Sequence, residues 1–468
     1  MSRLTVGVFN DSFPPTIDGV ANAALNYANS IEKNLGHAVV ATPWYPDCQD
    51  DYPFKVVRYP SAYISKRLGY RAGYPFDLRV LRYLQRQHID IIHVHAPFIS
   101  AVLARVLRRA TGAPIVFTYH TKFNIDIEKR VAFNPVRNAS VRFLLSNINA
   151  CDEVWVVSEG AGENLRSLGY TGEYRVMENG TDFQKGRAPE GLVAALREKH
   201  GLPPELPVFL FVGRMMWYKG VRISIDGLKA AKDAGKDFRM VFIGEGVDRP
   251  EIMDYAAKLG LAERCVFTGA VRDRELLRGY FSLADLFLFP STYDTNGIVV
   301  REAAACSCGS VLIRGSCAAE GIDDGETGIL IEENGGSMGK AIIEACGDRE
   351  RLRRIGENAA ERIYLSWDDA VARAYARYEE ILAAPARKSD RAAFNQAFFA
   401  EVQQIKEDYQ LHKSQFKEQL LHYYTRQARK ISRRNRRFKG RLYKLMKAMP
   451  ADPLHRKPGR ADSKHKNP

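Results

Sequence analysis

The sequence predicts an α/β protein in which two Rossmann-like domains face a cleft and a basic helical extension follows them. Three observations predict this architecture. Short apolar runs alternate with helical segments through residues 1–385, which is typical of parallel strands covered by helices. The series is interrupted by a weakly periodic stretch at residues 183–206 and then begins again. The excess of positive charge lies entirely near the C-terminus.

The composition is that of a globular protein with a basic tail. The chain has 468 residues, which suits two or three domains, and 46% of them are hydrophobic. The net charge is +14. Residues 421–468 contain 16 Lys or Arg and two acidic residues, which leaves 53 basic and 53 acidic residues in residues 1–420. The tail therefore carries the whole excess.

Cysteine usage and apolar content bear on where the protein works. Seven cysteines are scattered, and Cys306-Ser307-Cys308 has neither a zinc-binding spacing nor a second pair, so we expect small buried thiols in a reducing cytosol. The start, Met1-Ser2-Arg3 followed by one short apolar run, predicts a first strand and not a signal peptide. No window approaches the roughly 20 apolar residues of a membrane-spanning helix. We therefore expect a cytoplasmic protein whose membrane contact is peripheral.

The first domain is expected at residues 1–183. Its strands are predicted at residues 4–10, 38–42, 55–58, 89–95, 115–119 and 152–158. After the first strand, a turn containing Gly19 leads into a helix predicted over residues 22–33. A glycine in such a turn lets the backbone approach a phosphate or a sugar. The turn lacks the G-x-G-x-x-G spacing, and a helix cap with a tight turn is the open alternative.

Residues 60–88 (Pro60–His88) combine basic and aromatic side chains. Six Lys or Arg face a single acidic residue, Asp77, and they are interleaved with Tyr, Leu and Phe. One amphipathic segment of this kind suits an anionic membrane surface. The alternative is a solvated helix face.

Histidines end two of the predicted strands. His93-Val94-His95 closes the strand at residues 89–95, and His120 follows the strand at residues 115–119. The carboxyl ends of parallel strands are where open α/β sheets bind ligands. These histidines are therefore candidate ligand contacts, with a structural role as the alternative.

The second domain is expected at residues 184–385. A strand at residues 208–212 leads into Gly213-Arg214-Met215-Met216-Trp217-Tyr218-Lys219-Gly220 and then into a helix. Two cations beside a helix N-terminus can neutralise a departing diphosphate. The alternative is a pair of surface cations. Further strands are predicted at residues 240–246, 265–269 and 311–313, and a last helix at residues 367–381.

Residues 286–305 join an apolar strand, a small polar loop and an Ala-rich helix. Asp294 lies in the loop, and Glu302 lies eight residues later in the first turns of the helix. Both carboxylates can therefore reach one ligand across the helix start, where loop amides also suit an anion. The alternative is an ordinary strand–loop–helix unit with two solvated carboxylates.

The acid pair Asp294–x7–Glu302, together with the GRxxxxKG loop, resembles the signature of family 4 glycosyltransferases, which are retaining nucleotide-sugar enzymes of the GT-B fold. In that family the first acid binds hydroxyls of the donor sugar and the second binds the ribose. Two departures are visible. Asp294 replaces the commoner Glu, which could change the donor-sugar preference, and Asn296 replaces an aromatic residue. The resemblance covers about residues 1–385.

The resemblance implies a set of site residues. The catalytic group is His120, Arg214, Lys219 and Asp294. The donor-binding group is Gly19, Gly213, Arg214, Lys219, Gly244, Asp294, Asn296, Gly297, Ile298, Val299 and Glu302. His95 and Lys122 belong to the acceptor side, and residues 124–130 would face the acceptor opening.

The predicted reaction uses no metal ion and no cofactor beyond the nucleotide-sugar donor. We find no carboxylates paired for a covalent double displacement and no DxD-type metal site with a supporting context. Arg214, Lys219 and loop amides are expected to stabilise the leaving diphosphate. The acceptor would attack from the face that the nucleotide leaves, which retains the configuration of the sugar.

Two segments indicate the acceptor. His95-Ala96-Pro97-Phe98 and STYDTNGIVVREAAAC at residues 291–306 look most like bacterial diacylglycerol glucosyltransferases. This likeness implies UDP-glucose as the donor and a membrane lipid or lipid-linked acceptor at the cytoplasmic face. Two alternatives stay open: a soluble or polysaccharide acceptor, and a non-catalytic protein that binds a nucleotide-sugar or a lipid.

The extension at residues 386–468 breaks the α/β pattern. Residues 394–424 predict a helix, residues 425–449 are strongly basic with apolar side chains between, and residues 450–468 are expected to be disordered. The basic part resembles a polybasic membrane anchor, in which each charge near the surface contributes on the order of 1 kcal/mol. A nucleic-acid tail is the rival, because phosphates attract the same charges, but no nucleic-acid fold accompanies it.

Overall fold

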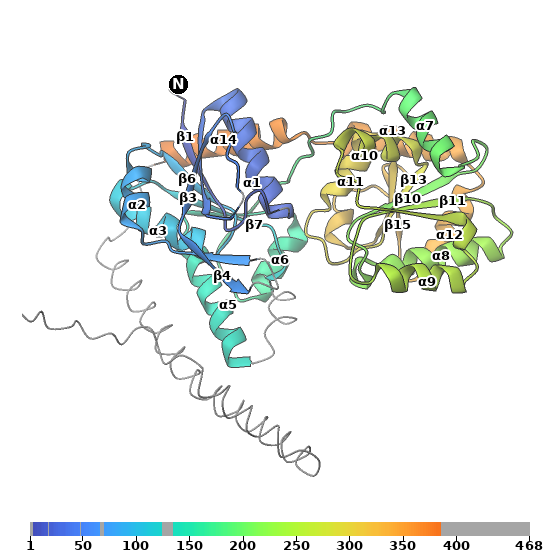
Figure 1. Ribbon diagram of the computed structural model, residues 1–468, viewed down its shortest axis with the longest axis horizontal. Helices are drawn as coiled ribbons and strands as arrows, with labels where there is room; N and C mark the ends of the chain where they lie inside the picture. The colour runs from blue at the N-terminus through green and yellow to red at the C-terminus, as the bar shows by residue number, and fades with distance from the viewer. Residues whose placement is uncertain (1–2, 17, 47, 66–69, 124–133, 385–468) are drawn as a thin grey trace, which may run out of the picture. The chain divides into compact units, whose positions relative to one another are not determined.

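The computed structural model describes residues 3–384, except residues 17, 47, 66–69 and 124–133 (Figure 1). Three predictions lie outside the described residues: the extension at residues 386–468, the acceptor-side segment at residues 124–130, and part of Pro60–His88. The described residues confirm the α/β fold class, since they form two parallel sheets with helices. The predicted domain limits, 1–183 and 184–385, stay predictions.

The first sheet has seven parallel strands in the order β3-β2-β1-β6-β7-β8-β9. Its strands are β1 (Thr5–Phe9), β2 (His37–Pro43), β3 (Lys55–Tyr59), β6 (Ile91–Val94), β7 (Ile115–Tyr119), β8 (Glu153–Val156) and β9 (Arg175–Val176). The helices of this part are α1 (Gly19–Ser30), the π-helix η1 (Ile31–Leu35), α2 (Leu78–Gln85), α3 (Ile99–Thr111), α5 (Asn134–Asn149) and α6 (Glu159–Ser167). Buried apolar side chains pack on both faces of this sheet.

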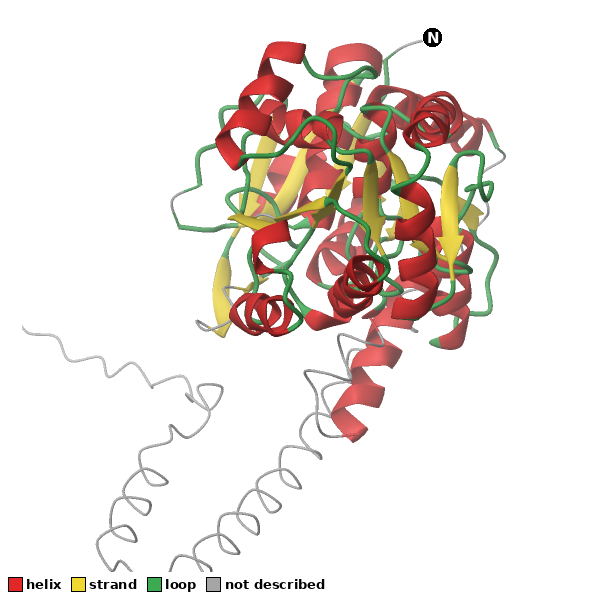
Figure 2. Ribbon diagram, turned by 90° about the vertical axis from the view of Figure 1, so that its right-hand side faces the viewer, coloured by secondary structure: helices red, strands yellow, loops and turns green. Residues whose placement is uncertain are grey.

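The second sheet has six parallel strands in the order β12-β11-β10-β13-β14-β15. Its strands are β10 (Val208–Val212), β11 (Arg239–Ile243), β12 (Cys265–Gly269), β13 (Leu286–Phe289), β14 (Gly309–Ile313) and β15 (Gly328–Ile331). Its helices are α7 (Glu190–His200), α8 (Val221–Asp233), α9 (Arg249–Lys258), α10 (Arg274–Leu283), α11 (Ile298–Ala305), α12 (Gly335–Ala345) and α13 (Arg349–Arg362), with short 3-10 helices η2 (Trp217–Lys219), η3 (Ala262–Arg264) and η4 (Cys317–Ala319). Figure 2 shows the helices packed around the strands.

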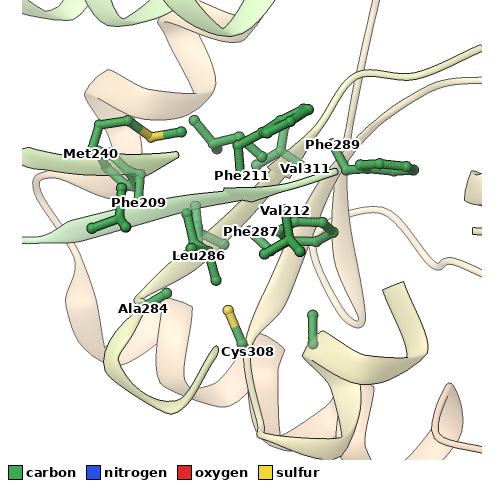
Figure 3. Close-up of a cluster of buried hydrophobic side chains, with 14 of the residues drawn as sticks. Phe209, Phe211, Val212, Met240, Ala284, Leu286, Phe287, Phe289, Cys308 and Val311 are labelled. Atoms are coloured by element: carbon green, nitrogen blue, oxygen red, sulfur yellow. The ribbon is translucent and has the colours of Figure 1, made fainter. Parts of the chain in front are cut away.

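The central strands of the second sheet are apolar at every position because both of their faces are covered. All residues of β10 and β13 are buried, and the ring of Phe289 lies 5.4 Å from that of Phe287 and 6.4 Å from that of Phe211, while Phe209 contacts Phe238 (Figure 3). Burying one such side chain contributes roughly 1.5–3 kcal/mol. This core fixes the ends of β10 and β13, from which the next loops start.

Helix α14 (Trp367–Ala383) follows the second sheet in sequence but packs on the first. Figure 1 shows it, in orange, near α1 and β1. The Tyr375 hydroxyl accepts the Leu4 N–H at 2.8 Å, and the Tyr378 hydroxyl hydrogen-bonds His93 Nδ1 at 2.6 Å. The Arg377 guanidinium also binds the Glu153 carboxylate. The last described helix thus ties the two sheets into one unit.

Two local predictions were wrong. The first helix begins at Gly19 and not at residue 22, because the Asp18 carboxylate caps it by accepting the N–H groups of Val20 and Ala21. Pro60–His88 is not one amphipathic segment. It contains an antiparallel hairpin, β4 (Ser61–Ser65) and β5 (Tyr70–Gly73), and then the short helix α2.

None of the helices in the described part of the chain combines the length and apolar character that crossing a bilayer requires. All seven cysteines are free, and Cys306, Cys308 and Cys317 are buried as expected.

Candidate active site

The strand order reverses once in each sheet, and predicted site residues lie near the strand ends at these reversal points. In the second sheet β11 and β12 lie on one side of β10, whereas β13 to β15 lie on the other. This reversal point, at the ends of β10 and β13, is the usual ligand position of open α/β sheets. The first sheet reverses in the same way between β1 and β6.

Lys219 and Asp294 meet at the reversal point of the second sheet. Lys219 Nζ lies 2.6 Å from Asp294 Oδ1, and the Ser291 hydroxyl donates to Asp294 Oδ2 at 2.5 Å. Lys219 is buried, with 7% of its surface exposed. The two loops touch closely, since a Cβ on Gly220, whose φ is +75°, would lie 1.9 Å from the Pro290 carbonyl oxygen. The structure thus brings together two groups that the sequence predicted separately.

Two tyrosines surround this ion pair. The rings of Tyr218 and Tyr293 lie 4.7 Å apart, and Lys219 Nζ lies 5.8 and 5.4 Å from their centroids. The exposed Arg214 guanidinium lies 5.9 Å from the Tyr218 ring. Cations held against aromatic faces gain electrostatic stabilisation. Sequence reasoning did not assign a role to either tyrosine, although each directly precedes a predicted site residue.

Glycines allow close backbone packing around the same reversal point. Gly244 has a φ of +141°, and a Cβ there would lie 1.8 Å from the Gly213 carbonyl oxygen. Gly297 has a φ of +60° and precedes the first residue of α11, Ile298. No side chain of the described residues caps this helix. Its first N–H groups, including that of Val299, are therefore available to bind an anionic group placed at the helix start.

The loop between β13 and α11 also contacts the segments that follow β7 and β8 of the first sheet. Thr295 Oγ1 donates to the His120 carbonyl at 2.6 Å, and Asn296 Nδ2 donates to the Val157 carbonyl at 2.8 Å. Lys122 Nζ donates to the Thr292 carbonyl at 2.9 Å. Asn296 and Lys122 therefore join the two halves of the site.

The histidines form a buried stack behind this loop. His95 Nδ1 lies 3.0 Å from His120 Nε2, and His93 contacts the hydroxyls of Thr118 and Tyr378, each at 2.6 Å. Burial lowers the pKa of His120 to about 3. Burial, and then the charge of neighbouring histidines, lowers the pKa of His93 and His95 well below the usual range. All three imidazoles are neutral at physiological pH.

Glu302 lies in α11, buried with 6% of its surface exposed. Its Oε1 accepts a hydrogen bond from Arg274 Nη2 at 2.8 Å. Burial raises the pKa of the Glu302 carboxyl, and the adjacent guanidinium opposes this rise. Arg274 was not singled out from the sequence.

Comparison with known proteins supports a family assignment. A family model described as "Glycosyltransferase Family 4" matches residues 17–185, and one described as "Glycosyl transferases group 1" matches residues 193–362. The chain is a family 4 glycosyltransferase. Two similar proteins are both named alpha-monoglucosyldiacylglycerol synthase. That of Acholeplasma laidlawii is 24% identical over 76% of this chain and 92% of its own, and that of Streptococcus pneumoniae is 25% identical over 64% and 69%.

Solved structures agree with this glycosyltransferase in fold. Anabaena HepE in complex with UDP and glucose has a TM-score of 0.63 at 17% identity and covers 82% of this chain and 100% of its own. Sucrose-phosphate synthase from Thermosynechococcus elongatus has a TM-score of 0.65 at 21% identity with the same coverage. The fold is GT-B, as expected.

One predicted residue of the glycosyltransferase, Gly19, and one residue that was not predicted, Asp11, lie at the reversal point of its first sheet. Gly19 starts α1, and a Cβ there would meet no atom within 4 Å, so the space beside it is open. Asp11, which the sequence analysis missed, precedes it in the same turn and accepts the Ser100 N–H at 2.8 Å. Burial raises the pKa of Asp11 to about 7, and its Oδ2 has no hydrogen-bond partner among the described residues. A polar residue directly after a first strand was the available signal.

Proposed function

We propose that this glycosyltransferase transfers a hexose from UDP-glucose to a membrane-lipid or lipid-linked acceptor and retains the sugar's configuration. One observation carries the proposal: Lys219, Asp294 and Arg214 gather at the reversal point of the second sheet, beside the start of α11. Cations and helix amides at one point suit the charge that develops on a leaving diphosphate. Asp294 carries acceptor oxygens suited to sugar hydroxyls.

In the proposed mechanism the leaving diphosphate is stabilised by Arg214, Lys219 and the amides of Ile298 and Val299. Asp294 orients the donor sugar as it gains oxocarbenium character, and Glu302 anchors the ribose. The acceptor hydroxyl attacks the sugar carbon as its bond to the diphosphate breaks, and its proton passes to the departing diphosphate oxygen. The attack comes from the side of His120, whose neutral imidazole can accept or donate a hydrogen bond but carries no charge. No metal ion takes part in this scheme.

The names of related proteins support the choice of substrates. Two relatives are named for glucosyl transfer to diacylglycerol, and a third, from Corynebacterium glutamicum, is a GDP-mannose-dependent alpha-mannosyltransferase that is 25% identical over 70% of this chain and 77% of its own. UDP-glucose is therefore the first donor to test and GDP-mannose the second.

An exposed apolar and basic surface supports a lipid acceptor. We call this surface the α2 patch; its apolar members are Trp44, Tyr74, Phe76, Leu78 and Tyr83. Leu78 is 65% exposed, and Arg79, Arg82 and Arg86 of the same segment are also exposed. Large apolar groups beside cations suit the interface of an anionic bilayer. The basic residues 421–468 belong to the same proposal, which puts the enzyme at the inner face of the membrane.

Donor turnover tests the enzymatic part of the proposal. UDP-glucose and GDP-mannose are each incubated with the protein and vesicles containing diacylglycerol, or with soluble glycosides, and the released nucleoside diphosphate is measured with and without EDTA. We expect release from UDP-glucose, unaffected by EDTA, and an α-linked product by NMR. Turnover with soluble glycosides alone would contradict the lipid acceptor, and a loss in EDTA that metal restores would contradict the metal-free scheme. No turnover of either donor would favour the non-catalytic alternative.

A further inference from the structure

Glu302 is a buried carboxylate that depends on one cation. It lies in α11, and its Oε1 accepts from Arg274 Nη2 at 2.8 Å. An isolated carboxylate at this depth would lose its hydration without compensation and would tend to take up a proton. The guanidinium therefore decides both the position and the charge of Glu302.

Arg274 is itself held in place from two sides. Its Nε donates to Asp182 Oδ2 at 3.0 Å, and its Cζ lies 4.3 Å from the ring centroid of Phe183. Asp182 and Phe183 belong to the segment that leads from β9 to α7, and Arg274 is the first residue of α10. A planar guanidinium bound by two carboxylates and an aromatic face has little freedom to turn.

Few other charges act on Glu302. Among the described residues, Arg274 lowers the pKa of Glu302 and Asp182 raises it, after the larger effect of burial, which raises it. The Cys306 thiol lies close to Glu302, but burial raises its pKa to about 11, so it is neutral at physiological pH. The ionisation of Glu302 is therefore set by burial and the Asp182 carboxylate, which raise its pKa, against one guanidinium, which lowers it.

We propose that Arg274 is a positioning residue for donor binding: it holds Glu302 in place and ionised, so that the carboxylate can accept hydrogen bonds from the ribose hydroxyls of the nucleotide-sugar. The inference rests on the ribose-binding role proposed for Glu302. Arg274 acts through Glu302 and makes no contact with the donor itself.

This role has a distinctive pH signature. A carboxylate accepts a hydrogen bond from each ribose hydroxyl, whereas the protonated acid keeps a proton on one of its oxygens. Without Arg274, burial is unopposed and the pKa of Glu302 rises further, so donor affinity should fall as the pH is lowered. If Arg274 touched the donor directly, its replacement would instead weaken donor binding about equally at every pH.

The test measures UDP-glucose binding by calorimetry between pH 6 and pH 8.5. The variants are Arg274→Met, Arg274→Lys, Glu302→Gln and the double variant Arg274→Met with Glu302→Gln. Arg354→Met is the matched control, because Arg354 pairs with Glu350 on the exposed surface of α13. Thermal unfolding of each variant verifies that it is folded.

We expect Arg274→Met to weaken binding mainly at low pH, by about tenfold for each unit by which the pKa of Glu302 rises. Arg274→Lys should keep most of the wild-type affinity for UDP-glucose, and Arg354→Met should leave that affinity unchanged. In the Glu302→Gln background, Arg274→Met should add little, because the group through which it acts no longer titrates.

The outcomes separate this inference from the proposed function. If the wild-type protein binds no UDP-glucose, or if Glu302→Gln binds as well as wild type, the proposed donor role of Glu302 falls and the inference falls with it. If Glu302→Gln weakens binding but Arg274→Met weakens it equally at all pH values, or not at all, the donor site stands and the inference is overturned.

Discussion

Lys219 is a buried cation whose neighbours are one carboxylate and two aromatic rings. Because its ammonium is already desolvated and oriented, it can stabilise a developing phosphate charge with little reorganisation. We expect Lys219→Ala to lower kcat for sugar transfer by about 10²–10³-fold, the usual effect of removing one preorganised charge. Steady-state kinetics with saturating UDP-glucose measures this effect.

Lys229→Ala is the matched control for that experiment. Lys229 pairs with Asp233 on the surface of α8, as Lys219 pairs with Asp294 at the reversal point of the second sheet. Exposed pairs contribute little, so Lys229→Ala should keep wild-type kcat. Equal activity of the Lys219→Ala variant and the wild type would remove Lys219 from the mechanism.

At the scale of elements, the neutral histidines at the ends of β6 and β7 make stability depend on pH. Their folded-state pKa values lie below the unfolded value of about 6.5, so below that pH the unfolded chain binds more protons and stability falls as pH falls. Asp11 acts in the opposite direction, since burial raises its pKa to about 7 and the folded state then binds the proton more tightly. We expect the three histidines to change the stability more than this one carboxyl, so the stability should fall as the pH falls below about 6.5.

His93→Gln isolates the effect of one histidine. We expect the wild type to lose about 1.4 kcal/mol more stability per pH unit than the variant between pH 6.5 and pH 5. Urea unfolding at several pH values gives both curves, and their difference in slope is independent of any constant loss from the substitution. Parallel curves would mean that His93 does not account for the acid sensitivity.

The elements also show what the sequence can and cannot predict. Continuous apolar runs such as β10 and β13 are visible locally because both faces of a central strand are buried. The contact of Lys219 with Asp294 joins loops from two different strands, and no local pattern carries it. The hairpin β4–β5 was missed because its mixed basic and aromatic residues have the composition of an amphipathic helix as well.

Arg274 illustrates the same limit at the site. Its sequence neighbours give no signal, and its role appears only once Arg274 meets Glu302. Asn296 was predicted to bind the donor, but its contact with the Val157 carbonyl depends on the tertiary structure and could not be predicted. Asp294 and the GRxxxxKG loop could be found because each stands between a strand and a helix, and Glu302 could be found because it lies eight residues after Asp294 in the helix that follows.

At the scale of the whole molecule, the α2 patch should direct the enzyme to anionic membranes. We expect the double variant Phe76→Ser with Leu78→Ser to reduce sedimentation with phosphatidylglycerol vesicles at least about tenfold, because two large apolar side chains no longer leave water. Its hydrolysis of UDP-glucose without vesicles should not change, since neither residue belongs to the donor site.

Val247→Ser is the control for the patch. Val247 is 80% exposed but lies between β11 and α9, away from the α2 patch in the sequence and in the fold. Its replacement should leave vesicle binding unchanged. If both variants bind vesicles like the wild type, the patch does not contact the membrane.

The most direct measurement is the transfer of labelled glucose from UDP-glucose into the lipid extract of vesicles that contain diacylglycerol, with wild type and Lys219→Ala side by side. The proposed function predicts a labelled glycolipid with the wild type and at least about a hundredfold less with the variant. Labelled glucose that stays in the aqueous phase, or equal lipid labelling by both proteins, would contradict it.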